Sequence, residues 1–196
     1  MKLSFSEYMF ILMALAACGY IYYNSEYNQL KCIISGVDGN KYCVRERAKL
    51  HEAADRLAKV NQRMKKLVDH CAKKFKHQEN VRRLVKGYDP KKIYETLPTS
   101  KYTAYSENKG EKLAFCLHTE KNNTTMIDMN TLTFVALHEL AHIASLSVGH
   151  TEEFWNNFKF LLQQGEVIGI YKPQNYNKKP ERYCGMTIND NPYYSA

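Results

Sequence analysis

Two histidines and a glutamate within five residues are the part of this sequence best suited to chemistry. The run His138-Glu139-Leu140-Ala141-His142 lies in a segment whose apolar residues recur every three or four positions, which is typical of a helix. Residues four positions apart share one face of a helix, so both imidazoles can bind the same zinc ion. Glu139 can then take a proton from a water molecule that the zinc ion acidifies. The motif therefore predicts a hydrolytic zinc site with His138 and His142 as ligands and Glu139 as the general base.

A catalytic zinc ion needs three protein ligands, so the sequence must supply one more. His150 is the preferred candidate, because the glycine before it can end the helix and let the chain turn back toward the metal. Glu166, beyond the next helix, is the alternative. His118 ends an apolar segment and could approach the same cleft. Glu152 and Glu153 are closer in sequence, but they are expected in the first turn of the next helix, where carboxylates suit the helix dipole.

The elements that must position this motif are predicted from its surroundings. The active-site helix is expected at about 130–147 with Asn130 as its N-cap, and another helix with an apolar face follows from Thr151. A long amphipathic helix is expected at about 45–78. Short strands are predicted at 41–44, 101–105 and 112–117. The last of these strands is the most apolar, and we expect it to be the edge that pairs with an extended peptide. Together the elements predict an α+β fold with a small antiparallel sheet.

Positive charge is concentrated around the long helix. Residues 45–92 contain sixteen Lys and Arg residues against six Asp and Glu residues, and the whole chain carries a net charge of +8. Such a surface suits nucleic acid or anionic lipid as a partner. The alternative is a solvated helix face without a partner.

The N-terminus has the composition of a membrane anchor. Residues 8–23 contain no charged residue, and as a helix they would extend about 24 Å, close to the hydrocarbon core of a bilayer at roughly 30 Å. We expect an uncleaved transmembrane anchor at 1–25 and one domain at 26–196. A cleaved signal peptide and a buried core helix are the alternatives. Only Lys2 precedes the segment, whereas five basic residues follow it between Lys31 and Lys49, so the domain is predicted on the cytosolic side.

The cysteines are interpreted as free thiols. All six are far apart in the sequence and none forms a CxxC pair, so neither a disulfide framework nor a cysteine-based zinc ribbon is indicated. Free thiols favour a reducing compartment, where the two overlapping glycosylation acceptors at 122–125 would have no meaning. A hydrophobic content of 44% and a charged content of 24% exclude a disordered chain.

The motif and its surroundings resemble the WLM and SprT-like zinc metallopeptidases, in particular those predicted in large DNA viruses. The similarity rests on HELAH at 138–142, on the Gly-His pair that ends at His150 and on Glu153-Phe154-Trp155 at the start of the next helix. It is tight across about 130–165 and looser across 36–190. The resemblance implies a zincin fold, with His138, His142 and His150 as zinc ligands and Glu139 as general base. Cellular relatives cleave proteins crosslinked to DNA, but this chain departs from them by its N-terminal segment and by lacking an evident DNA-binding or ubiquitin-binding module.

The leading hypothesis is a membrane-anchored zinc endopeptidase whose substrate is a protein or peptide. Tyr183, in the loop-rich tail, is a candidate stabiliser of the oxyanion that forms when water attacks the peptide carbonyl. The alternative hypothesis is a structural membrane or virion protein on a zincin scaffold, without turnover. All residue types that the hydrolytic reaction needs are present, which favours the enzyme.

Overall fold

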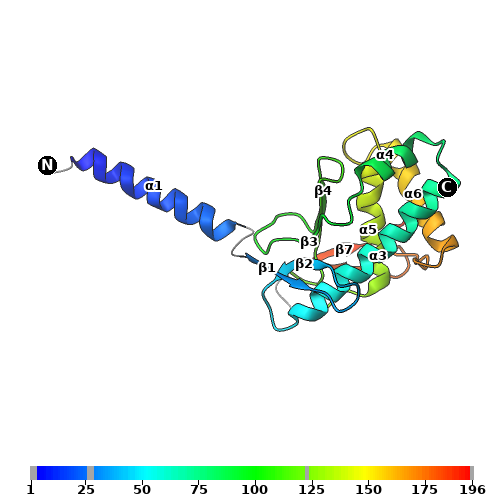
Figure 1. The fold of residues 1–196 in the computed structure, drawn as a ribbon, viewed down its shortest axis with the longest axis horizontal. Coiled ribbons are helices and arrows are strands. Elements are labelled where there is room, and N and C mark those ends of the chain that lie inside the picture. Colours follow the sequence, from blue (N-terminus) through cyan, green and yellow to red (C-terminus); the bar gives the residue numbers. More distant parts are fainter. Residues whose placement is uncertain (1–3, 26–28, 122–123, 195–196) are drawn as a thin grey trace.

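An isolated N-terminal helix and a folded body make up the protein (Figure 1). The computed structural model describes residues 4–25, 29–121 and 124–194. Helix α1 covers Phe5–Asn24, and Ser4 caps it by accepting a hydrogen bond from the amide of Glu7. Its apolar stretch, Phe5–Tyr23, is long enough to cross a membrane, and none of the stretch is buried. Figure 1 shows α1 pointing away from the body, so it is not a core helix of this chain. A membrane span and a signal sequence both fit these properties.

The body contains a five-stranded sheet whose spatial order is β1-β2-β3-β5-β4. The strands are β1 (Leu30–Ile34), β2 (Lys41–Arg45), β3 (Ile93–Glu95), β4 (Ala104–Glu107) and β5 (Lys112–Phe115). The β1–β2 and β4–β5 pairs are antiparallel, but β2–β3 and β3–β5 are parallel. The sheet is therefore mixed, and the prediction of an antiparallel sheet is wrong. The chain leaves β2 and returns to β3 through long helices, and such a crossover brings the strands together in parallel.

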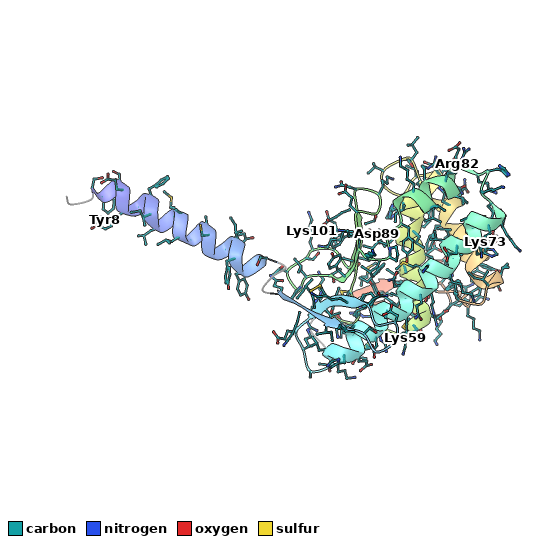
Figure 2. The ribbon with its side chains drawn as sticks, in the orientation of Figure 1. Tyr8, Lys59, Lys73, Arg82, Asp89 and Lys101 are labelled. Carbon is teal, nitrogen blue, oxygen red and sulfur yellow. A yellow bond between two sulfur atoms is a disulfide. The ribbon has the colours of Figure 1, made fainter. Side chains whose placement is uncertain are left out.

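Among the described residues of the body, four helices pack beside this sheet. They are α3 (Leu50–Lys74), α4 (Glu79–Gly87), α5 (Met129–Ala144) and α6 (Glu152–Val167). Helix α5 lies at the centre and contacts α3, α4, α6 and β4. The predicted basic helix thus begins five residues later than expected, because Arg45 belongs to β2. Its apolar stripe is buried between Ala54 and Cys71, whereas Lys59 and Lys73 extend from the outer side of α3, as Arg82 does from α4 (Figure 2).

Two disulfide bonds contradict the prediction that all cysteines are free. Cys32 on β1 lies opposite Cys43 on β2 and is bonded to it. Cys116, just after β5, is bonded to Cys184, and only Cys18 and Cys71 are free thiols. The sequence alone does not predict these pairings. Strand register brings Cys32 to Cys43, and a contact across 68 residues brings Cys116 to Cys184. Disulfides are typical of oxidising environments, so the expected reducing compartment loses its support. The glycosylation acceptors, Asn122 and Asn123, lie outside the described residues.

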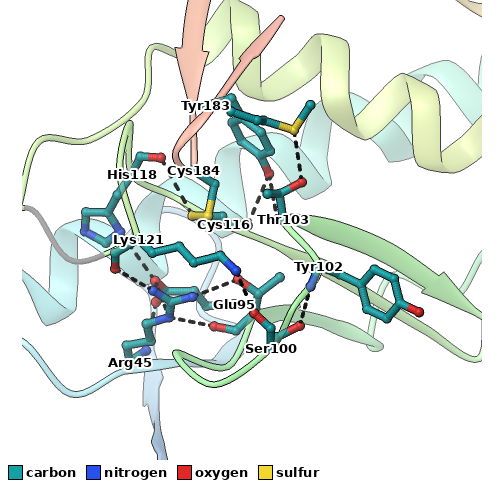
Figure 3. Close-up of a disulfide and its surroundings, with 12 residues drawn as sticks. Arg45, Glu95, Ser100, Tyr102, Thr103, Cys116, His118, Lys121, Tyr183 and Cys184 are labelled. Carbon is teal, nitrogen blue, oxygen red and sulfur yellow. Dashed lines mark hydrogen bonds and ion pairs between the residues drawn. A yellow bond between two sulfur atoms is a disulfide. The ribbon is translucent and has the colours of Figure 1, made fainter.

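The Cys116–Cys184 bond attaches a C-terminal hairpin to the sheet (Figure 3). The hairpin consists of β6 (Glu181–Tyr183) and β7 (Met186–Ile188), where the sequence predicted only loops. Its turn residues, Cys184 and Gly185, have φ angles of 52° and 85°, and their amides donate to the carbonyls of His118 and Thr119. The hairpin is therefore joined to the end of β5 by a covalent bond and by backbone hydrogen bonds.

A buried polar network lies next to this disulfide (Figure 3). The guanidinium of Arg45 is 2% exposed, and it donates to the backbone carbonyls of Thr96 and Lys121 at 2.6 and 3.0 Å. The carboxylate of Glu95 lies 3.5 Å from both Arg45 and the Nδ1 atom of His118. His118 is 3% exposed and belongs to this network. It contributes to the packing between the sheet and the hairpin.

Candidate metal centre

Helix α5 places two imidazoles on one face. Asp128 caps the helix by accepting hydrogen bonds from the amides of Asn130 and Thr131 at 2.8 and 2.9 Å, so the predicted cap, Asn130, is wrong by two positions. Leu132, Ala136 and Leu140 are fully buried. His138 and His142 are only partly buried, and their ring centroids lie 5.0 Å apart. The helix therefore leaves one face open, and this face carries both histidines.

His150 joins these two rings from the loop after the helix. Its Nε2 atom lies 3.1 Å from the Nε2 atom of His138, and its ring centroid lies 5.0 Å from that of His142. One ligand atom from each of the three histidines lies within 4.8 Å of the others. Gly149, with a φ of 83°, allows the chain reversal that the sequence indicated. The structure thus brings together the three histidines that the sequence had singled out.

Aromatic side chains lie behind the three imidazoles. The ring of Phe154 is 4.8 Å from that of His138, 4.3 Å from that of His142 and 4.7 Å from that of His150. Phe158 lies 5.2 Å from His138. Both phenylalanines are buried. Phe154 and Phe158 of the predicted apolar face of α6 therefore belong to the core and restrict how the imidazoles can rotate, whereas Trp155 of the same face is 40% exposed.

The electrostatics of the cluster suit a metal ligand set. Burial, reinforced by the neighbouring imidazoles, lowers the pKa of His138 to about 3 and that of His142 to about 4. Both rings are therefore neutral at pH 7, which is the form of histidine that binds metal. Burial raises the pKa of Glu139 to about 8, and this residue is only 4% exposed. A carboxyl group with such a pKa can both accept and release a proton near neutral pH.

The spacing of the donors fits zinc. Three imidazole nitrogens with an open fourth position are a recognised donor set for catalytic zinc. Two nitrogens bound at about 2.0–2.1 Å in tetrahedral geometry would lie about 3.3 Å apart. The 3.1 Å separation of the Nε2 atoms of His138 and His150 is close to this value. The spacing of this pair and the neutral rings of His138 and His142 are therefore compatible with a zinc ion.

The loop that carries His150 is held by charged side chains that the sequence analysis had not assigned to it. The carboxylate of Glu153 accepts hydrogen bonds from the amides of Leu146 and Ser147, both at 2.9 Å. These amides and the Ser147 hydroxyl lower the pKa of Glu153 to about 2. Lys109 donates to three carbonyl groups at the end of α5, and Arg83 donates to one more. No local pattern signals the contacts of Lys109 and Arg83, since they join segments more than thirty residues apart in the chain.

Of the other two candidate residues, Glu166 lies away from the histidines, whereas Tyr183 lines the same cavity as they do. Glu166 is exposed near the C-terminal end of α6, accepts a hydrogen bond from the hydroxyl of Tyr193 and does not belong to the histidine cluster. Tyr183 is 1% exposed, and its hydroxyl accepts a hydrogen bond from the amide of Cys116 at 3.2 Å and donates to the carbonyl of Thr103 at 3.3 Å (Figure 3). Its role as an oxyanion stabiliser stays a prediction.

A cleft of about 1120 Å³ opens at the histidines. Its walls are β4, the exposed face of α5, the loop before α6 and the C-terminal segment from Met186 to Pro192. Strand β4 is at the end of the sheet order, with β5 on its inner side. The edge beside the cleft is therefore β4, and the expectation that the 112–117 strand forms this edge is wrong.

Comparison with known proteins agrees with this architecture. The family model of the WLM domain matches residues 52–194, which include α3 except for its first two residues, α4 to α6 and the whole cleft. The chain belongs to the WLM family. The resemblance inferred from the motif at 138–155 is thereby confirmed.

Relatives of this WLM protein occur in large DNA viruses. The uncharacterized protein R325 of Acanthamoeba polyphaga mimivirus is 28% identical over 184 residues, which cover 92% of this chain and 93% of the relative. The uncharacterized protein 136R of Invertebrate iridescent virus 6 is 36% identical over 62 residues, covering 31% of this chain and 35% of the relative. The crystal structure of Wss1 from Saccharomyces cerevisiae matches the WLM fold with a TM-score of 0.50 at 16% identity, covering 64% of this chain and 86% of that one.

Proposed function

We propose that this WLM protein is a zinc-dependent endopeptidase that is anchored in a membrane by α1. The observation that carries the proposal is the convergence of His138, His142 and His150 beside the buried carboxyl group of Glu139. The three imidazoles would hold the ion, and Glu139 is left free of ligation to handle protons. The cleft that opens at these residues has room for an extended segment of a protein substrate.

In the proposed hydrolysis, Glu139 transfers the proton and the histidines hold the metal ion. When bound, zinc polarises the scissile carbonyl and lowers the pKa of water. Glu139 accepts the proton of the attacking water at its carboxylate and then delivers it to the nitrogen of the leaving amine. Burial raises the pKa of Glu139 to about 8 in the metal-free protein, and the positive charge of a bound zinc ion would lower this pKa and favour the carboxylate that accepts the proton.

Substrate binding is assigned to the edge strand. Strand β4 uses one edge to pair with β5, which leaves its other edge for a peptide in extended conformation. Tyr105 on β4 and Trp155 on α6 line the same cleft and offer apolar contact for substrate side chains. A peptide held there would pass the three histidines.

Membrane anchoring is proposed from the exposure and composition of α1. A helix of 20 residues that buries none of its apolar surface within the protein is unfavourable in water and favourable in a bilayer. The basic residues after α1 favour the cytosolic side for the body, whereas two disulfides favour an oxidising environment. We therefore propose the anchor itself. A count of free thiols in the purified protein then decides between the cytosolic side and the oxidising side of the membrane.

A cleavage assay distinguishes an enzyme from a non-catalytic scaffold. The full-length protein in detergent is incubated with casein, and the Glu139→Gln variant is measured beside it after both have been shown to contain the same amount of zinc. We expect cleavage by the wild type and a loss of at least about 100-fold in the variant, because general-base catalysis contributes on this scale. Equal rates in the two proteins would refute the enzyme.

A further inference from the structure

The position of His150 depends on a loop that has little hydrophobic packing of its own. The loop connects α5 to α6, and its two large apolar residues point outward, with Leu146 75% exposed and Val148 88% exposed. His150 itself is exposed. Without apolar burial, polar contacts must hold such a loop in one conformation.

Glu153 supplies these contacts from the first turn of α6. One carboxylate oxygen accepts a hydrogen bond from the amide of Leu146 at 2.9 Å, and the other accepts from the amide and the hydroxyl of Ser147 at 2.9 and 2.8 Å. Arg83 donates to Glu153 at 2.9 Å and also to the carbonyl of Ala144 at 2.8 Å. The carboxylate thus accepts the hydrogen bonds of the loop amides. Arg83 connects this carboxylate to the end of α5.

Lys109 holds the carbonyl groups of the same loop. Its ammonium donates to the carbonyls of His142, Ser145 and Ser147 at 3.0, 2.8 and 2.6 Å. The turn that carries Lys109 is pressed against α4, since a Cβ atom on Gly110 would lie 2.1 Å from the carbonyl oxygen of Gly87. The amides of the loop are therefore bound by the negative side chain of Glu153 on α6. The carbonyls are bound by the positive side chain of Lys109, in the turn between β4 and β5.

We propose that Glu153 is a positioning residue of the metal site, which acts by holding the loop in the conformation that brings His150 to the other two imidazoles. The proposal rests on the assignment of His150 as the third ligand. A loop that is already ordered loses less conformational entropy when its histidine binds a metal, so the affinity is higher. Lys109 complements Glu153 by binding the carbonyl groups of the same loop. Glu153 itself contacts neither the imidazoles nor the cleft.

Metal binding by the full-length protein tests this role, with Co²⁺ as the probe because its visible absorption reports coordination. Glu152 provides the matched control, since it is an exposed carboxylate in the same helical turn. We expect Glu153→Gln to weaken Co²⁺ binding by about 10-fold or more, as loss of supporting contacts around ligands does, and to reduce the intensity of the four-coordinate spectrum. Glu152→Gln should bind Co²⁺ like the wild type.

A second comparison separates positioning from a general effect on the fold. If Glu153 acts through His150, Glu153→Gln should change Co²⁺ affinity little when His150→Ala is already present. A loss of the same size in both backgrounds would overturn the proposal, and so would wild-type affinity in Glu153→Gln.

Two further outcomes are distinguishable. If Glu153→Gln does not fold, Glu153→Asp keeps the charge and shortens the side chain, and it must then show an affinity between those of the wild type and His150→Ala. Wild-type affinity in Glu153→Asp would contradict the proposed role. Failure of the wild type to bind Co²⁺ would instead refute the metal site itself.

Discussion

The carboxylate of Glu153 accepts two hydrogen bonds from Ser147, one from its amide and one from its hydroxyl, at 2.9 and 2.8 Å. These bonds form with the ionised carboxylate, and together with the amide of Leu146 they lower its pKa to about 2. A depressed pKa means that the stabilising contribution is complete above the usual pKa of about 4.5 and disappears as the pH falls toward 2. The loop should therefore loosen only in strong acid.

This relation predicts a defined pH dependence. The difference in melting temperature between the metal-free wild type and Glu153→Gln should be constant from pH 7 to about 5 and should shrink below about 4.5. Thermal unfolding followed by circular dichroism measures it, with Glu152→Gln as the control that shows no such window. A difference that stays the same down to pH 3 would contradict the assigned contacts.

Glu139 should show the opposite behaviour. Burial raises its pKa to about 8, so the folded protein binds a proton that the unfolded chain releases above about 4.5. Metal-free wild type should therefore lose stability between pH 4.5 and 8, by at most about 1.4 kcal/mol for each pH unit, relative to Glu139→Gln. Chemical denaturation at pH 4 and pH 8 measures this. Equal stabilities of the two proteins at both pH values would mean that Glu139 is not buried as described.

Thiol counting tests the two disulfides. The denatured protein should react with about two equivalents of an alkylating reagent without reduction, at Cys18 and Cys71, and with six after reduction. Replacing Cys184 by Ser should destabilise the body by about 4 kcal/mol, given the 68 residues between Cys184 and Cys116. Cys71→Ser is the control that leaves both bonds intact. Six reactive thiols in protein purified from its native source without reductant would refute both bonds and restore the cytosolic assignment.

Membrane anchoring predicts that charges in the middle of α1 release the protein. Leu12 and Met13 are exposed and lie near the centre of the apolar stretch. Changing both to Lys should shift most of the protein from the carbonate-resistant membrane fraction to the soluble one, because each lysine costs about 2.5–3.5 kcal/mol at the centre of a span. The same change at Tyr23, at the end of the helix, should have little effect. A wild-type protein that is itself carbonate-soluble would exclude the anchor.

More of the site than of the fold could be predicted, because the sequence patterns that indicate the site are local. The four-residue spacing of His138 and His142 and the glycine before His150 specify which side chains share a face and where the chain turns. The supporting charges of Lys109 and Arg83 were not predictable, since each contacts backbone carbonyls more than thirty residues away.

The errors in the fold have the same physical origin. Strand β3 has only three residues, and it forms because β2 and β5 pair with it on both sides. The disulfide between Cys32 and Cys43 follows from strand register, which depends on β1, a strand that the sequence analysis did not identify. Asp128 caps α5 although Asn130 has an equally suitable side chain, because the helix begins at Met129.

Zinc analysis of single variants of the purified full-length protein tests the central claim most directly. We predict about one zinc ion in the wild type, in Glu139→Gln and in Glu166→Ala, and a large loss of zinc in His138→Ala, His142→Ala and His150→Ala. Glu139→Gln should keep its zinc because it removes a base and no ligand. Full zinc occupancy in His150→Ala together with loss of zinc in Glu166→Ala would contradict the three-histidine site and transfer the third ligand to Glu166.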